Sequence, residues 1–355
     1  MYKENGKKIL MISEALSAPF DEGIKNVAFS LYTHVKSRSD LIAVTGIEND
    51  TNNLTIEKVC LNKLFLSPGL RRLIRTHAPD IILYLPEASV TFNSFIRAKI
   101  LKMLCGAARV VVLGVQHRGY TTAQEFILSK LLKPDLLLLM GKADEKYFLS
   151  RGMRVKVLSP AVDCIKFAPS TKAERKKIRG EYNIPDNKTV VLHVGHIKAD
   201  RNIECLLELQ KIDNIQVVLV GSTSMETDHD LKDALVKSGI KIIDVYVPDI
   251  PIIYGMADIY VFPVRGGVTG AIDMPLSVLE AMACNLPVIS TRFGALPDFF
   301  KEDSALRYFD TREELAGLIK GMDINEEIDN NKKMQPFTWS RFADEVITAC
   351  DELYE

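Results

Sequence analysis

Hydrophobic and polar positions follow two alternating patterns along this chain. Short, nearly continuous apolar runs are typical of strands buried in a parallel sheet. Between them lie segments with apolar residues three and four positions apart, the pattern of amphipathic helices. The first half predicts strands at Ile9–Ser13, Ile42–Thr45, Ile81–Leu85, Val110–Val115, Leu136–Met140 and Val155–Leu158, and helices at Ile24–Val35, Leu70–Arg75 and Phe126–Leu132. This alternation indicates βα units on a parallel sheet.

The pattern breaks once and then restarts. Ala168-Pro169 is followed by the highly charged stretch STKAERKKIRGEYNIPDNK, which we interpret as a polar linker. A last amphipathic helix is expected at Trp339–Leu353. Two doubly wound sheets fit better than one, with ligands beyond the carboxyl ends of the strands, in a cleft between the domains. The second set of predicted strands is Thr189–Val194, Gln216–Val220, Lys241–Tyr246, Ile259–Phe262 and Pro287–Ser290.

Composition limits the function classes. The chain has 355 residues, 47% of them hydrophobic, which is enough for about two domains. Its net charge of −1 gives no global basic field for nucleic acid. The six cysteines have no CxxC spacing and suggest a reducing compartment. No apolar run approaches a membrane span, and the start, MYKENGKKILMIS, lacks the apolar region of a signal peptide. We therefore expect a soluble cytoplasmic protein.

A basic loop follows the strand in TVVLHVGHIKADRNIECLLEL. Gly195 permits a tight turn, and the start of the next helix would offer free amide groups. His196, Lys198 and Arg201 would supply positive charge to a diphosphate. Basic residues in a surface loop are also commonly just solvated, so the pattern alone leaves both interpretations open.

A carboxylate stands in the apolar helix of PLSVLEAMACNLPVISTRFGALPDFF. Asp273-Met274-Pro275 predicts a helix start with Asp273 as N-cap. Leu276 and Leu279 then face the core at helical spacing, and Glu280 lies within two turns of the N-terminus. Two carboxylate oxygens can accept from the vicinal hydroxyls of a ribose. A surface glutamate on an amphipathic helix is the alternative.

Six segments together resemble the retaining glycosyltransferases of family 4, which have the GT-B fold. They are PFDEGIKN, GVQH, LSPAVDCIKFAP, VGHIKADRN, ADIYVFP and PLSVLEAMACNLPVIS, in the family's order over nearly the whole chain. The resemblance implies an α/β protein of two Rossmann-like doubly wound domains facing a central cleft. We expect an acceptor-binding domain at 1–168, a domain binding the nucleotide sugar at 169–338, and a helix at 339–355 packing back across the domains.

The resemblance also implies site residues. His117 matches the histidine that contacts the donor sugar, Glu280 the ribose ligand and Arg201 a phosphate-loop lysine, while His196 stands where arginine is usual. Arginine and lysine differ in geometry, and the charge of histidine is conditional. The implied donor-binding residues are Gly23, Gly195, His196, Lys198, Arg201, Val247, Leu276 and Glu280, and the implied catalytic residues are His117, Arg201 and Asp273.

The sequence departs from the family at one position. A second glutamate is usual eight residues before the ribose ligand, and here the residue is Ile272. We expect Asp273 and the amides of the loop Arg265–Gly270 to take its sugar-side role, with helix capping as the competing explanation. The stretch Asp228-His229-Asp230 has DxD spacing but lies before a helix, and no metal site is expected.

The implied activity is transfer of a sugar from a nucleoside-diphosphate donor to an acceptor hydroxyl, with retention and without metal or other cofactor. The acceptor is a carbohydrate, a lipid-linked molecule or another small molecule. The alternatives are a degenerate protein that binds nucleotide sugar without turnover, and a GT-B sugar-nucleotide epimerase. The run Arg71-Arg72-Leu73-Ile74-Arg75 could touch anionic headgroups at the inner membrane face, or it is a solvated helix face.

Overall fold

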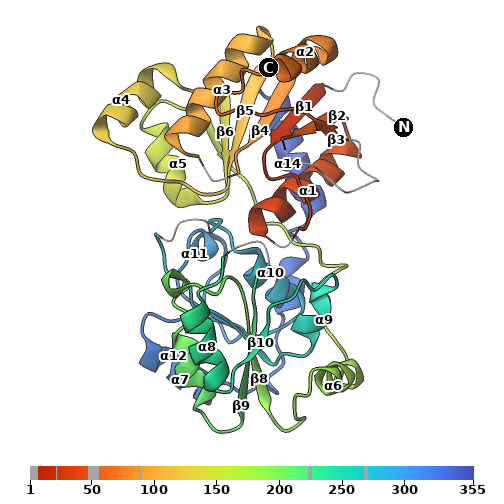
Figure 1. Ribbon diagram of the computed structural model, residues 1–355, viewed down its shortest axis with the longest axis vertical. Coiled ribbons are helices and arrows are strands. Elements are labelled where there is room, and N and C mark those ends of the chain that lie inside the picture. Colours follow the sequence, from red (N-terminus) through yellow and green to blue (C-terminus); the bar gives the residue numbers. More distant parts are fainter. Residues whose placement is uncertain (1–6, 21, 47–55, 88–89, 223–225, 268–270) are drawn as a thin grey trace. The chain divides into compact units, whose positions relative to one another are not determined.

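The computed structural model describes residues 7–20, 22–46, 56–87, 90–222, 226–267 and 271–355. The described chain forms two compact units (Figure 1). The first unit comprises the described residues of Met1–Pro160 and Gly270–Met274, with Trp339–Glu355. The second comprises those of Ala161–Thr269 and Pro275–Thr338. The segments at 270–274 and 339–355 therefore return to the first unit from distant parts of the sequence.

The first unit is built on a parallel sheet in the order β3-β2-β1-β4-β5-β6-β7. β1 pairs with both β2 and β4, so the order reverses direction between β1 and β4. In open α/β sheets this switch point is where crevices for ligands form. The strands are β1 (Lys8–Ser13), β2 (Asp40–Thr45), β3 (Ile56–Lys58), β4 (Ile81–Leu85), β5 (Arg109–Gly114), β6 (Leu136–Leu139) and β7 (Val155–Val157).

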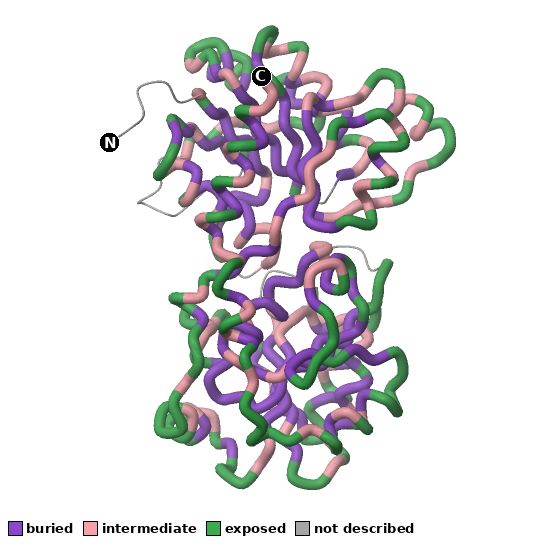
Figure 2. Tube along the Cα trace, turned by 180° about the vertical axis from the view of Figure 1, so that it is seen from behind, coloured by how far each residue is buried: buried purple, intermediate pink, exposed green. Residues whose placement is uncertain are grey.

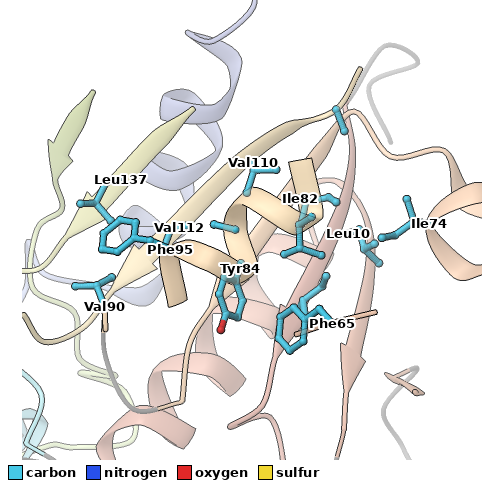
Figure 3. Close-up of a cluster of buried hydrophobic side chains, with 14 of the residues drawn as sticks. Leu10, Phe65, Ile74, Ile82, Tyr84, Val90, Phe95, Val110, Val112 and Leu137 are labelled. Carbon is cyan, nitrogen blue, oxygen red and sulfur yellow. The ribbon is translucent and has the colours of Figure 1, made fainter. Parts of the chain in front are cut away.

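Helices cover both faces of this sheet because its strands are apolar on both sides. Alternate strand residues such as Leu10, Ile82 and Val112 form one core cluster with α2, α3, α4 and α5 (Figure 3). On the other face α1 and α14 pack against each other, and α1 packs against β2. The helices are α1 (Gly23–Lys36), α2 (Pro68–His77), α3 (Phe92–Cys105), α4 (Thr122–Leu131), α5 (Lys142–Leu149) and α14 (Trp339–Asp351).

The second unit has a parallel sheet in the order β10-β9-β8-β11-β12-β13. Its strands are β8 (Thr189–Val194), β9 (Ile215–Val220), β10 (Lys241–Ile243), β11 (Ile259–Phe262), β12 (Val288–Ser290) and β13 (Leu306–Tyr308). The central strands of each sheet are buried (Figure 2). Both units are thus doubly wound α/β sheets, as the sequence predicts.

Helices cover both faces of the second sheet as well. α7, α8 and α12 share one core cluster with the strands. On the other face α10 packs against β11, β12, α9 and α13. The helices are α6 (Lys172–Glu181), the 3₁₀ turn η1 (Ala199–Arg201), α7 (Cys205–Gln210), α8 (His229–Lys237), α9 (Ile250–Gly255), α10 (Leu276–Ala283), α11 (Leu296–Phe299), α12 (Arg312–Gly321) and α13 (Asn330–Met334).

The charged stretch expected to be a linker is instead mostly a helix, so that prediction is wrong. α6 begins with a capping box, in which Thr171 and Glu174 each bond the other's backbone amide. Its buried Arg179 donates to Asp258 at 2.6 Å, which fixes the helix to the second unit. The sequence shows no apolar helical pattern here because only a narrow stripe of α6 is buried, and the buried residue is the polar Arg179.

No helix in the described ranges is both long and apolar enough to span a membrane.

Candidate functional site

The basic loop of the second unit begins where β8 ends. A helix is expected after this loop. The 3₁₀ turn η1 comes first, and the helix α7 begins at Cys205. Asn202 has a left-handed φ of +57° and donates through Nδ2 to the carbonyl of Pro263, 2.9 Å away. This bond ties the loop to the end of β11. The predicted order of strand, glycine, basic loop and helix is therefore confirmed, with the 3₁₀ turn η1 inside the loop.

Gly195 lies directly over a buried histidine. A Cβ atom at this position would lie 2.8 Å from His193 Nε2, so only glycine fits. His193 Nδ1 lies 3.0 Å from the carbonyl of Val261, to which it donates, and Nε2 is left as an acceptor facing the turn. Burial lowers the pKa of His193 to about 4, and the positive charge of Arg201 adds to the effect. The imidazole beneath the loop is therefore neutral at physiological pH.

Arg201 is a cation with little access to water, since only 6% of its surface is exposed. Burial lowers its pKa, and the nearby Asp200, with 3.7 Å between Arg201 Nε and Asp200 Oδ1, opposes the shift. An arginine remains charged under such a shift. His196 and Lys198 are partly buried on the same turn. The turn therefore concentrates positive charge where screening by water is weak.

The helix α10 places Glu280 as the sequence predicts, but its start differs. Leu276 and Leu279 are buried, and the N-cap is Pro275, which makes no side-chain capping bond. Asp273 is therefore not the helix cap, and that interpretation is wrong. The loop proposed at Arg265–Gly270 lies outside the described residues from Val268 onward.

Glu280 is oriented by a tyrosine. The hydroxyl of Tyr254, a fully buried residue of α9, donates to Glu280 Oε2 at 2.7 Å. Burial raises the pKa of Glu280, while the Tyr254 bond and the charge of Lys166 oppose this shift. Glu280 is thus a positioned carboxylate rather than a solvated surface charge.

Tyr260 connects Glu280 with the basic turn. Its hydroxyl lies 3.4 Å from the carbonyl of Val194, the residue before Gly195. Ser277 on α10 also bonds this hydroxyl, and Glu280 lies close enough to raise its pKa. One buried side chain therefore connects the carboxylate with the basic turn that follows β8.

The end of β10 differs from the prediction. The strand stops at Ile243, and Val245 and Tyr246 are 64% and 47% exposed. Val247, expected directly after the strand, is a partly buried residue in the loop before α9. The apolar run continues beyond the end of β10, so the strand predicted at Lys241–Tyr246 was too long.

The acidic DxD stretch has a structural role. Asp228 accepts from the amide of Leu231 at 3.1 Å and is the N-cap of α8. Its own amide donates to the carbonyl of Ile197, which holds the start of α8 against the basic turn. Asp228 thus caps α8, and Asp230 lies in the first turn of that helix.

In the first unit, His117 and Asp273 come together at the end of β5. His117 Nδ1 lies 2.9 Å from Asp144 Oδ1, with the ring of Tyr147 4.5 Å away. The amide of Asp273 donates to the carbonyl of Val115 at 2.7 Å, and its carboxylate accepts from the amide of His117. Burial and the negative charge of Asp144 raise the pKa of Asp273 to about 7.

Gly23, the first residue of α1, lies close to Ile272, the residue before Asp273. A Cβ atom there would lie 2.9 Å from Ile272 Cδ1, so the glycine makes room for the residue before Asp273. The first unit thus holds Gly23, His117 and Asp273. The second holds the other predicted residues, namely Gly195, His196, Lys198, Arg201, Val247, Leu276 and Glu280.

A polar cluster lies at the switch point of the first sheet. Glu14 follows β1, and Arg97 of α3 donates to both of its oxygens, at 2.9 and 3.1 Å. The hydroxyl of the buried Tyr84 also donates to Glu14, at 3.3 Å. Arg97 Nε reaches the carbonyl of Lys63 at 2.9 Å. The cluster fixes the loops around the carboxyl ends of β1 and β4.

Sequence reasoning missed several of these residues. Tyr254 and Asp144 carry no local signal, because each becomes relevant only through a contact far along the chain. His193 did carry one, since a histidine inside an apolar strand needs a buried partner.

Comparisons with known proteins show which families and folds this chain is similar to. Residues 174–334 match the family model described as glycosyl transferases group 1. Sulfoquinovosyl transferase SQD2 of Arabidopsis thaliana is 26% identical over 269 residues, 70% of this chain and 49% of that protein. D-inositol 3-phosphate glycosyltransferase of Arthrobacter sp. is 29% identical over 154 residues, 40% of this chain and 35% of its own length. The chain thus spans about half or less of these curated relatives.

Solved structures are similar over nearly the whole chain. A glycosyltransferase from Rickettsia africae has a TM-score of 0.76 at 15% identity, covering 99% of this chain and all of that one. Anabaena Alr3699/HepE in complex with UDP has a TM-score of 0.77 at 15% identity, covering 97% of this chain and all of that one. The protein has the GT-B fold. Within its second unit, residues 174–334 are similar to glycosyl transferases group 1, which agrees with the predicted resemblance to glycosyltransferases.

Proposed function

We propose that this protein is a glycosyltransferase that uses a nucleoside-diphosphate sugar as donor. The observation that carries the proposal is the arrangement around Glu280. Tyr254 holds one of its carboxylate oxygens and so fixes the orientation of the carboxylate, which supports a role as acceptor for a pair of hydroxyls, and Tyr260 connects it with the cationic turn at Arg201. A ribose on Glu280 would place its diphosphate within reach of that turn. UDP bound to HepE, a protein of the same fold, supports a nucleotide ligand.

The proposed transfer retains the anomeric configuration and uses no protein nucleophile. The acceptor hydroxyl attacks the anomeric carbon on the face from which the nucleoside diphosphate departs, and a phosphate oxygen takes the proton. Arg201 and Lys198 stabilise the negative charge that grows on the leaving diphosphate. This stabilisation replaces that of a divalent metal. His117 and Asp273 are proposed to contact the donor sugar, with the carboxyl of Asp273 able to donate a hydrogen bond below pH 7.

The partners of the proposed reaction are a nucleotide sugar and a hydroxyl-bearing acceptor. Among the described residues all six cysteines are free thiols, as expected in a reducing compartment. We accordingly propose a cytoplasmic location.

A thermal-shift panel with UDP, GDP, ADP, TDP and CDP tests the proposal. A nucleotide at about a hundred times its dissociation constant adds about 2.7 kcal/mol to the free energy of unfolding. Glu280→Gln should abolish most of this shift, because a neutral amide accepts less strongly from the ribose. Glu313→Gln, on the exposed surface of α12, is the matched control. If no nucleotide stabilises the wild type, the donor site does not exist.

Turnover is tested separately. Slow hydrolysis of the matching nucleotide sugar, without any acceptor, should be lost in Arg201→Gln. Nucleotide binding without any hydrolysis or transfer would favour a protein that binds the sugar nucleotide without turnover. Release of an epimerised sugar in place of transfer would favour an epimerase.

A further inference from the structure

We propose that Asp144 of α5 is the positioning residue of His117. Its carboxylate accepts a hydrogen bond from Nδ1 of the imidazole, orients the ring and leaves Nε2 as an acceptor for a hydroxyl of the donor sugar. The proposal deepens the proposed function, on which it rests for the identity of the ligand. The substrate class that it names is a donor sugar whose group facing His117 is a neutral hydroxyl rather than a carboxylate or sulfonate.

The bond between the two side chains determines which ring nitrogen carries the proton. His117 Nδ1 lies 2.9 Å from Asp144 Oδ1, and an ionised carboxylate can only accept, so Nδ1 donates. In a neutral imidazole the other nitrogen then has a lone pair. Nε2 of His117 is buried and makes no hydrogen bond to any described residue. A buried acceptor without a partner is rare in folded proteins, which points to a ligand that donates to it.

Asp144 has no competing structural partner. It lies in the first turn of α5, where the N-cap residue Gly141 makes no side-chain bond. Among the described residues, the carboxylate of Asp144 forms a hydrogen bond with His117 alone. The two side chains are 21% and 17% exposed, so water competes weakly for their bond. Apart from its charge at the start of the helix, the contact with His117 is therefore the main role of Asp144.

Aromatic rings hold the imidazole in this orientation. The ring centroid of Tyr147 lies 4.5 Å from that of His117, and those of Phe148 and Tyr120 lie 5.0 and 5.4 Å from it. Tyr147 and Phe148 belong to α5, as Asp144 does. One helix thus supplies both the hydrogen bond at Nδ1 and much of the packing around the ring.

The helix α5 is itself fixed to α4, which lies beside it (Figure 1). The hydroxyl of Tyr147 donates to Glu125 of α4 at 2.7 Å, and Arg151 donates to the same carboxylate oxygen at 2.6 Å. The guanidinium of Arg151 also covers the ring of Tyr147, 3.4 Å from its centroid. Asp144 is therefore carried by a braced helix, as a positioning residue requires.

The charge of Asp144 also acts on Asp273. Burial, and after it the charge of Asp144, raise the pKa of Asp273 to about 7. A protonated Asp273 can donate to a hydroxyl oxygen, while Nε2 of His117 accepts from a hydroxyl hydrogen. Hydroxyl groups can serve both side chains, whereas an ionised carboxylate or sulfonate has no proton for Nε2. The pair therefore favours a neutral sugar.

The tautomer of His117 tests the proposal without any substrate. In the full chain, isotope-labelled at the histidine nitrogens, NMR couplings between ring nitrogens and ring carbon protons show which nitrogen is protonated. The signals of His117 are those lost in His117→Gln. At a pH about two units above the ordinary pKa of histidine, we expect the proton on Nδ1, although an isolated histidine prefers Nε2. A proton on Nε2, or on both nitrogens, would overturn the proposal.

Asp144→Asn keeps the shape of the side chain and removes its charge. The new amide can donate to Nδ1, so the ratio of tautomers should shift at least about tenfold toward the form with the proton on Nε2. Glu145→Gln removes one charge from the same turn of α5 and is the matched control, with the wild-type tautomer expected. An equal shift in both variants, or none in Asp144→Asn, would contradict the proposed role. The wild-type spectrum remains decisive if Asp144→Asn does not fold.

Turnover tests whether Asp144 acts through His117. In acceptor-free hydrolysis of the matching nucleotide sugar, Asp144→Asn should lower kcat/KM about tenfold, and Glu145→Gln less than about twofold. Asp144→Asn combined with His117→Gln should be less than about threefold slower than His117→Gln alone, because most of the effect passes through the imidazole. Losses that multiply in full would assign Asp144 an independent role and overturn the proposal.

The substrate class is tested with two forms of one nucleotide. The nucleoside diphosphate that stabilises the protein is supplied with either glucose or glucuronic acid attached. We expect the glucose form to bind at least about tenfold more tightly, because its hydroxyl can donate to Nε2. Equal or tighter binding of the glucuronic acid form would overturn the assignment of a neutral hydroxyl.

The nucleotide thermal shift separates this proposal from the proposed function. Asp144→Asn should keep the wild-type shift, because the basic turn and Glu280 lie in the second unit. If no nucleotide binds but the proton is on Nδ1, the proposed function fails and Asp144 still positions His117. If a nucleotide binds and the proton is on Nε2, the proposed function stands and this proposal fails.

Discussion

Two partly buried carboxyl groups of this protein differ mainly in their nearest partners. Burial raises the pKa of both Glu280 and Asp273. Tyr254 donates to Glu280 and stabilises its ionised form, whereas Asp144 repels a charge on Asp273. The first is therefore suited to accept hydrogen bonds from hydroxyls, and the second can hold a proton near neutral pH.

Removing the tyrosine hydroxyl should change the pH dependence of nucleotide binding. In Tyr254→Phe the pKa of Glu280 rises further, because the buried carboxylate loses a donor. Affinity at neutral pH should fall roughly tenfold, and the pH below which binding is lost should move upward. Titration of the stabilising nucleotide at several pH values measures both effects, with Tyr246→Phe on the exposed loop as control. A binding curve identical to that of wild type would contradict the role of Tyr254.

The raised pKa of Asp273 predicts that the free energy of unfolding decreases as the pH rises. Its pKa is about 7 in the folded protein and near 3.8 when unfolded, so the folded state binds the extra proton between these values. Its contribution is fully present below pH 3.8 and is lost as pH rises through 7. Asp273→Asn should remove this slope and stabilise the protein by about 1–2 kcal/mol at pH 8, after allowance for partial exposure. Denaturant unfolding from pH 5 to 8 measures it, and Asp351→Asn should leave the slope unchanged.

At the scale of elements, the sequence predicted those strands and helices whose formation depends on neighbouring residues. β8 and β11 were predicted to the residue, because their side chains are apolar on both faces. The edge strands β3 and β13 were missed, since each has only three residues, too few to form a pattern. α6 was taken for a linker because its stability depends on a partner far along the chain, Asp258. The capping sequence from Thr171 to Glu174 does indicate the start of a helix.

The Arg179–Asp258 pair should be essential for anchoring α6. Asp258 also accepts from the amide of Val190, at 2.8 Å, and from Arg175, at 2.9 Å, so loss of Arg179 leaves a buried carboxylate with only the more exposed Arg175 as its cation. Arg179→Met should lower the free energy of unfolding by about 2–3 kcal/mol, less than the loss expected for a buried carboxylate left without any cation. Lys176→Gln, which breaks an exposed pair with Asp186, should cost less than 1 kcal/mol. Urea denaturation of both variants gives the comparison. Equal losses would mean that the buried pair has no special role.

At the scale of the whole molecule, the first unit contains segments from the middle and the end of the sequence as well as from its start. The helix α14 packs on α1, and Asp273 binds the carbonyl of Val115 just after β5, so two of the three candidate catalytic residues, His117 and Asp273, meet across a large separation in sequence. Hydrophobic periodicity predicts elements but not such pairings. The candidate donor residues, by contrast, lie on loops of one unit and could be recognised from their motifs.

This assembly predicts two unfolding transitions that respond to different perturbations. Phe342 is fully buried on α14 and packs edge-on against Trp339, with ring centroids 5.4 Å apart. Phe342→Ala should lower the stability of the first unit by about 3–5 kcal/mol, while the nucleotide should raise only the transition of the second unit. Thr348→Ala, at an exposed position of the same helix, is the control. Scanning calorimetry with and without nucleotide assigns the transitions. If Phe342→Ala and nucleotide always moved a single transition together, the two units would unfold as one, and α14 would stabilise the whole chain rather than the first unit.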